Sequence, residues 1–212
     1  MNLSQISRVS FATFLAVAFC AAATPTIGVA TAVGTFKVNS SDVEGNANVF
    51  DGTEIRTGKA PSQVFLSNGS AVTLGIDSAG TIYRDHLILQ SGATKVDNMT
   101  GYMVQAAAYR IRGGSSDSRA VVRFNGGDVE IAALAGSLDV LNSKGLLLTH
   151  IGAGTASAFN KDPQAQTGGP PPNTANRPKE AILYALLAAS IAGLGIAVDA
   201  VVQSGNVTPL SP

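Results

Sequence analysis

The sequence VFLSNGSAVTL, residues 64–74, predicts two short β-strands joined by a tight turn. Its two ends are rich in β-branched and apolar residues, which favour strands, and Ser67–Ser70 between them consists of turn-forming residues. An Asn-Gly pair flanked by such runs is a strong hairpin signal. Similar runs, spaced roughly 8–12 residues apart, are typical of an all-β sandwich, barrel or solenoid. We therefore expect residues 33–159 to form an all-β, Gly-punctuated domain of β-solenoid or sandwich-like architecture.

The composition of the 212-residue chain agrees with this fold class. Charged residues make up only 13% of the chain, and 23 residues are glycine. Low charge with many glycines favours strands and turns over solvated helices. The 14 basic and 14 acidic residues cancel, so no overall charge indicates a partner, and no nucleic-acid partner is expected.

The first 23 residues are predicted to be a signal peptide. Arg8 precedes an apolar run from Phe11 to Ala23 that is too short to span a bilayer comfortably. Small residues offer cleavage sites near Thr24 and Val33, with residues 24–32 as a short N-terminal segment. A short N-terminal membrane helix is the alternative. Cys20 suggests a lipoprotein, although the preceding Phe19 does not fit the small residue that lipidation requires.

The C-terminal part is predicted to be a membrane anchor. A Pro/Gly-rich linker, 160–180, precedes an apolar segment, 181–202, that is long enough for a transmembrane helix, and a short tail follows at 203–212. Small residues recur every fourth position in this segment, a pattern that favours helix self-association and thus a homo-oligomer. A buried helix or a secreted tail is the alternative. We expect an exported protein on the periplasmic or cell-surface side, anchored in the inner membrane, although basic residues before the helix conflict with that topology.

Five segments of the chain form a recognisable series: GTEIRTG (52–58), QVFLSNGSAVTL (63–74), LILQSG (87–92), YMVQAAAYRIRG (102–113) and LLTHIG (147–152). These segments resemble motifs of FecR-like domains, the extracytoplasmic β domains of a family of bacterial envelope regulators. The resemblance implies a β domain outside the cytoplasmic membrane. The family's regulators have a cytoplasmic region that binds a sigma factor. We do not expect that region here, because ten residues precede the apolar run. The usual Thr-Pro of the family is also missing.

The chain carries no recognisable catalytic or cofactor motif. His86 and His150 are too few for an all-histidine metal site, and no motif places a base beside a nucleophile. We therefore expect no enzyme activity, no metal and no cofactor. The leading hypothesis is a membrane-tethered module that binds a protein or an envelope polymer. A periplasmic sensor in signal transduction and a secreted hydrolase are the alternatives.

Four arginines form the candidate binding face. If residues 109–112 and 119–124 pair as a hairpin with Arg112 opposite Arg119, their apolar side chains share one face. The other face then carries Arg110, Arg112, Arg119 and Arg123. The guanidinium group binds carboxylate and phosphate in bidentate fashion, so such a face could recognise an anionic partner. A solvated strand face neutralised by nearby acidic residues is the alternative.

Overall fold

The computed structural model describes residues 24–160, and every regular element in this part of the chain is a β-strand. The all-β prediction is therefore confirmed for these residues. They include no helix that is long and apolar enough to cross a membrane; the predicted signal peptide and the predicted helix at 181–202 lie outside the described residues. The strands are β1 (Thr26–Val38), β2 (Ser41–Phe50), β3 (Thr53–Arg56), β4 (Ser62–Leu66), β5 (Ala71–Leu74), β6 (Ala79–Ile82), β7 (His86–Asp97), β8 (Met103–Ala106), β9 (Tyr109–Gly113), β10 (Arg119–Phe124), β11 (Asp128–Ala135), β12 (Leu138–Asn142), β13 (Leu147–Ile151) and β14 (Thr155–Asn160).

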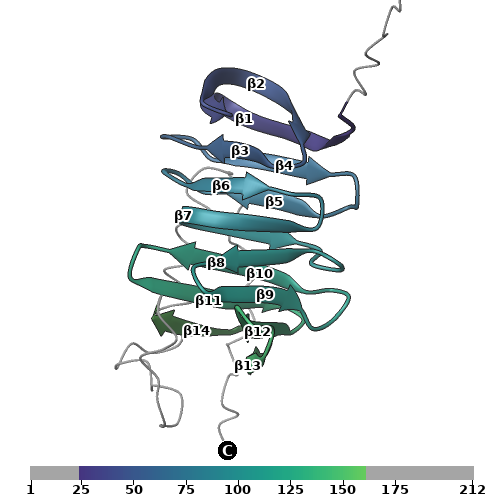
Figure 1. The fold of residues 1–212 in the computed structure, drawn as a ribbon, viewed down its shortest axis with the longest axis vertical. Coiled ribbons are helices and arrows are strands. Elements are labelled where there is room, and N and C mark those ends of the chain that lie inside the picture. The colour runs from purple at the N-terminus through teal and green to yellow at the C-terminus, as the bar shows by residue number, and fades with distance from the viewer. Residues whose placement is uncertain (1–23, 161–212) are drawn as a thin grey trace, which may run out of the picture.

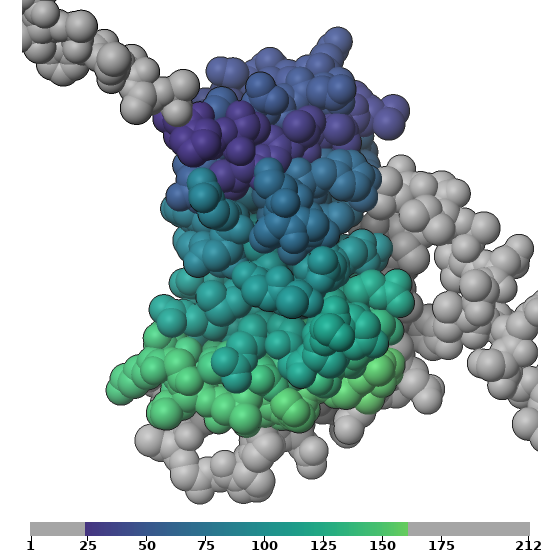
Figure 2. Space-filling view, turned by 90° about the vertical axis from the view of Figure 1, so that its right-hand side faces the viewer, coloured from purple at the N-terminus to yellow at the C-terminus, as the bar shows by residue number. Residues whose placement is uncertain are grey.

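The strands stack along one axis, from β1 and β2 at one end to β13 and β14 at the other (Figure 1 and Figure 2). Strands β1, β4, β5, β7, β6 and β3 pair in that order and close into a ring. Two open wings continue from β7, one formed by β8–β9–β12–β13 and the other by β10–β11–β14. The wings are sandwich-like, because buried residues of both belong to one hydrophobic core.

Strand β7 connects the ring to both wings because its two halves pair with different strands. Leu87–Leu89 pair with β6 and β8, whereas Gly92–Val96 pair with β10. Gly92 lies at the transition, with a φ angle of +83°. A Cβ atom at this position would lie 2.2 Å from Ser78 Oγ. Both the backbone conformation and the close approach therefore require glycine here.

The predicted turn at residues 67–70 is confirmed. It joins β4 to β5, and the two strands pair antiparallel. The Leu66 amide donates a hydrogen bond to the Ser70 carbonyl at 3.0 Å, and the Gly69 amide donates to the Leu66 carbonyl at 3.0 Å. Gly69 has a φ angle of +85°, which explains why a glycine stands at this point of the turn.

The domain starts earlier than the sequence analysis placed it. Strand β1 begins at Thr26, and Gly28–Ala32 pair with β4. The predicted boundary at Val33 thus falls inside this strand. Ile27 and Ala30 are buried in the core, so residues 26–32 belong to the β domain rather than to a separate N-terminal segment.

Two fully buried tyrosines differ in how their hydroxyl groups are satisfied. The Tyr109 hydroxyl donates to the Asn160 carbonyl at 2.6 Å, and its ring packs 5.1 Å from that of Phe159. These contacts fasten β14 to β9 across the core. The Tyr102 hydroxyl has no hydrogen-bond partner within the described part of the chain. Burial raises the pKa of Tyr102 above its ordinary value.

Candidate binding face on the β8–β9–β12–β13 wing

Strand β9 shows the alternation that the sequence predicts. Tyr109 and Ile111 are buried, and Arg110 and Arg112 are exposed on the opposite side of the strand. Side chains of successive strand residues point to opposite faces, so the two arginines lie on the outer face of the wing.

The predicted hairpin between residues 109–112 and 119–124 is wrong. Strand β9 pairs with β8 and β12, so Arg112 lies opposite Met103 and Asp139 rather than Arg119. Strand β10 belongs to the other wing, where it pairs with β7 and β11. Buried side chains of β9 and β10 belong to one hydrophobic core, to which the two strands contribute from different wings. The four arginines are therefore divided, two on each wing.

The chain passes from one wing to the other through the 114–118 loop, and Ser118 anchors the end of this loop. Its hydroxyl donates to the Ser137 carbonyl at 2.7 Å and accepts a bond from the Ser115 amide at 3.1 Å. Its carbonyl accepts a bond from the Met99 amide at 3.1 Å. Ser118 is fully buried. This small side chain therefore anchors the loop, and the chain enters β10 on the other wing.

Two of the four arginines are engaged in ion pairs. Arg112 donates to Asp139 Oδ2 from Nε at 3.0 Å and from Nη2 at 2.9 Å. The other carboxylate oxygen of Asp139 pairs with Nδ1 of His150 on β13. Arg123 pairs with the buried Glu130 at 3.3 Å. Acidic residues on neighbouring strands therefore pair with Arg112 and Arg123. For these two arginines, the structure agrees with the alternative of a strand face neutralised by nearby acidic residues.

Arg110 and Arg119 are exposed, and no ion pair joins either of them to another residue in the 24–160 range. Arg110 lies in the middle of its wing, between Gln105 on β8 and Leu141 on β12. Arg119 lies at the start of β10 on the other wing, opposite Ala135. Arg110 thus lies between the amide side chain of Gln105 and the apolar side chain of Leu141. Arg112 lies two residues away on the same strand.

The two histidines lie on the same wing but far from one another. Cross-strand register places His86, Met103, Arg112, Asp139 and His150 in one row. Four strand spacings separate the histidines, which corresponds to about 19 Å. In the part of the chain that the structure describes, no three His, Cys, Asp or Glu residues are grouped so that they could hold a metal ion.

His86 forms a local pair with the residues beside it. Its Nδ1 lies 2.7 Å from Asp85 Oδ1, and its ring stacks on Tyr83 with the ring centroids 4.4 Å apart. The hydrogen bond from His86 holds the pKa of Asp85 below its ordinary value. Neither imidazole bonds to a hydroxyl group of residues 24–160, so neither is positioned to activate a serine or threonine there.

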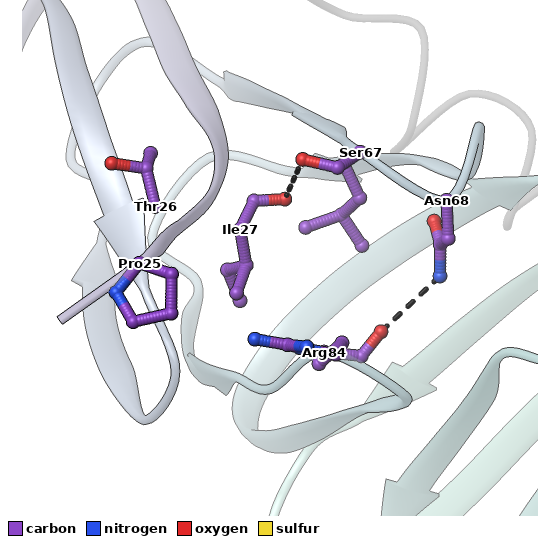
Figure 3. Close-up of a pocket in the computed structure, with 7 residues that line it drawn as sticks. Pro25, Thr26, Ile27, Ser67, Asn68 and Arg84 are labelled. Atoms are coloured by element: carbon purple, nitrogen blue, oxygen red, sulfur yellow. Dashed lines mark hydrogen bonds between the residues drawn. The ribbon is translucent and has the colours of Figure 1, made fainter.

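The structure also contains a cavity beside β1 and β4, toward the end of the stack where β1 lies. It has a volume of about 360 Å³ and mainly apolar walls (Figure 3). Arg84 is held there through its backbone, since its amide donates to Asp51 Oδ1 at 2.7 Å and its carbonyl accepts from Asn68 Nδ2 at 3.2 Å. The Ser67 hydroxyl donates to the Ile27 carbonyl at 2.9 Å. The lining residues are Pro25, Thr26, Ile27, Leu66, Ser67, Asn68 and Arg84.

No protein-family model matches the chain, and no curated protein matches it at a significant level. Two crystal structures described as a "putative anti-sigma factor from Parabacteroides distasonis ATCC 8503" are similar in fold. One is 13% identical, with a TM-score of 0.44, over 55% of this chain and 57% of that chain. The other is 14% identical, with the same TM-score, over 55% and 56%. The chain therefore spans little more than half the length of these structures. This likeness supports no conclusion about family or function, and the resemblance to FecR-like domains stays a prediction.

Proposed function

We propose that this chain is a non-enzymatic module of the bacterial cell envelope, held at the membrane by the helix at 181–202. Its β domain binds an anionic protein or polymer through the outer face of β9. The observation that carries this proposal is Arg110, an exposed guanidinium in the middle of a wing with no acidic partner among the described residues.

The surroundings of Arg110 suit a carboxylate or phosphate ligand. A guanidinium presents parallel N–H donors that match such groups in bidentate fashion. Arg112 lies two residues away on the same face, where Asp139 pairs with its guanidinium and holds it in place. Leu141 and Gln105 on the adjacent strands add apolar contact and an amide. A partner with both acidic and apolar groups would therefore complement this face.

Two further observations support binding rather than catalysis. Carboxylates engage both histidines, and neither imidazole contacts a hydroxyl of residues 24–160. The Arg112–Asp139–His150 row is therefore explained as a row of cross-strand polar contacts that stabilises the wing. Export and membrane anchoring rest on the sequence patterns at the two ends of the chain.

The test is binding of the purified full chain to cell-wall polymer and to washed envelope fractions of the native host, measured as a function of salt. The Arg110→Gln variant is compared with the Arg119→Gln variant, which removes the same charge from an exposed site on the other wing. A charge-assisted hydrogen bond contributes about 1.5–3 kcal/mol, so Arg110→Gln should weaken binding by about tenfold or more. Arg119→Gln should bind like the wild type. Binding that is insensitive to salt, or equal losses in the two variants, would contradict the proposed face.

A further inference from the structure

Three consecutive leucines are exposed at the end of the stack that is remote from β1. Leu146, Leu147 and Leu148 expose 63%, 57% and 43% of their surface. Leu147 and Leu148 begin β13, the last strand of its wing, and Leu146 directly precedes it (Figure 1). Exposed apolar side chains are unfavourable in water, and a group of them is a candidate interaction site. We call these three residues the leucine tip.

The backbone of β13 is poorly suited to accept another strand. Val140 pairs with Thr149 and Leu141 with Leu147, so Leu148 is an extra residue that forms a β-bulge. A bulge disrupts the ladder, and bulges are one means by which edge strands avoid further pairing. The leucine tip is therefore more suited to contact through side chains than to the addition of a partner strand.

The turn before the leucine tip is rigid and positively charged. The Asn142 side-chain oxygen accepts hydrogen bonds from the Lys144 amide and the Leu146 amide, both at 2.9 Å. These bonds hold Lys144 beside the leucines. The acidic residue of this hairpin, Asp139, is engaged by Arg112 and His150. The tip thus combines exposed leucines with an uncompensated lysine.

The position of the tip relates it to the membrane. Strand β14 ends at Asn160 at the same end of the stack (Figure 1). In the sequence, the predicted linker and the predicted anchor follow Asn160. Residues 161–180 could span at most about 70 Å when fully extended. The tether alone would therefore keep the domain near the bilayer without fixing its orientation.

We infer that the leucine tip inserts into the interfacial region of a membrane that contains anionic lipids. This inference rests on the proposed membrane tethering. Leucines buried at the boundary between headgroups and acyl chains lose their contact with water, and a neighbouring lysine is attracted to anionic headgroups. The contact would orient the domain with β13 and β14 toward the bilayer. The outer face of β9, at the side of the stack, would then remain open to its partner.

The test uses tryptophan as a depth probe, because the chain contains no tryptophan. The full-length Leu147→Trp protein is reconstituted into vesicles of phosphatidylglycerol and phosphatidylcholine with brominated acyl chains. An interfacial side chain lies about 5–10 Å deep, so its emission should fall by about half. The control is full-length Phe65→Trp, which replaces another exposed apolar side chain, on β4 in the ring. Its emission should change little.

Co-sedimentation of the same samples after carbonate washing tests the anchor separately. Quenching in the Leu147→Trp protein but not in the Phe65→Trp protein supports the inference. Adding Leu146→Ser and Leu148→Ser to the Leu147→Trp protein should abolish its quenching. A Leu147→Trp protein that co-sediments without being quenched, or equal quenching in the two proteins, overturns the inference while the anchor stands. A chain that fails to co-sediment contradicts the anchor. A blue shift of the Leu147→Trp emission with soluble envelope proteins but not with vesicles assigns the tip to a protein partner and also overturns the inference.

Discussion

Gly92→Ala tests whether the close approach of β7 to Ser78 stabilises the domain. The substitution adds one methyl group at the point where the strand passes from β6 and β8 to β5 and β10. The new Cβ atom would lie 2.2 Å from Ser78 Oγ and 2.6 Å from Ser78 Cα. Ser78 cannot move away easily, because its hydroxyl accepts a bond from the Ala93 amide at 2.9 Å and donates to the Ile76 carbonyl at 3.1 Å.

The expected loss of stability has two parts. A left-handed backbone costs an L-residue about 1–2 kcal/mol relative to glycine. Overpacking of a filled site costs about 1–3 kcal/mol in addition. Gly92→Ala should therefore lower the free energy of unfolding by about 2–5 kcal/mol, a large part of the roughly 5–15 kcal/mol that a typical domain has.

Gly145→Ala is the matched control. Gly145 has a φ angle of +81°, close to that of Gly92, and an added Cβ would meet nothing within 4 Å. This variant should lose only the backbone part, about 1–2 kcal/mol. The measurement is urea unfolding of a protein comprising residues 24–160, followed by circular dichroism. Equal losses in the two variants would show that the packing against Ser78 is not as tight as the geometry indicates.

Two further predictions concern single side chains. Tyr102→Phe removes a buried hydroxyl that has no partner among the described residues, so it should raise the free energy of unfolding by about 1 kcal/mol. Tyr109→Phe loses the hydrogen bond to the Asn160 carbonyl and should lower the free energy of unfolding by about 1 kcal/mol. Equal effects of the two substitutions in urea unfolding would refute this contrast. The pKa of Asp85 is depressed by His86, so this pair contributes stability above the ordinary range of aspartate, and the contribution is lost as the pH falls through the folded-state pKa. A carboxyl carbon NMR titration should therefore show the Asp85 midpoint rising in His86→Gln, and an unchanged midpoint would exclude the hydrogen bond as its cause.

Local patterns predicted the local structure well. The Asn-Gly turn at residues 67–70 and the alternation of Tyr109, Arg110, Ile111 and Arg112 depend on neighbouring residues, and the structure contains both. The division of β9 and β10 between two wings depends on Ser118, whose partners lie in other elements. The parity of side chains shows which face of a strand is buried. It does not show whether two buried faces lie side by side or meet across a core.

Only part of the candidate site could be predicted, because side-chain parity does not show which strands pair. Arg110 could be identified as an outward-facing cation from its place in the strand pattern. The engagement of Arg112 by Asp139 could not, because it depends on the pairing of β9 with β12. The leucine run 146–148 resembles a buried strand in sequence, and only its place at the end of a wing makes it exposed. Edge position is a property of topology and leaves little signal in composition.

Protease treatment of spheroplasts of the native host is the most direct test of an exported, membrane-held β module. The account predicts that the untreated chain stays in the membrane pellet after carbonate washing. Protease added outside the cell should cut within residues 161–180 and release a resistant fragment, because that linker is predicted to lie outside the folded domain and residues 24–160 contain all the described strands. A chain that is protected from external protease, or that is found in the soluble cytoplasmic fraction, would contradict the central claim.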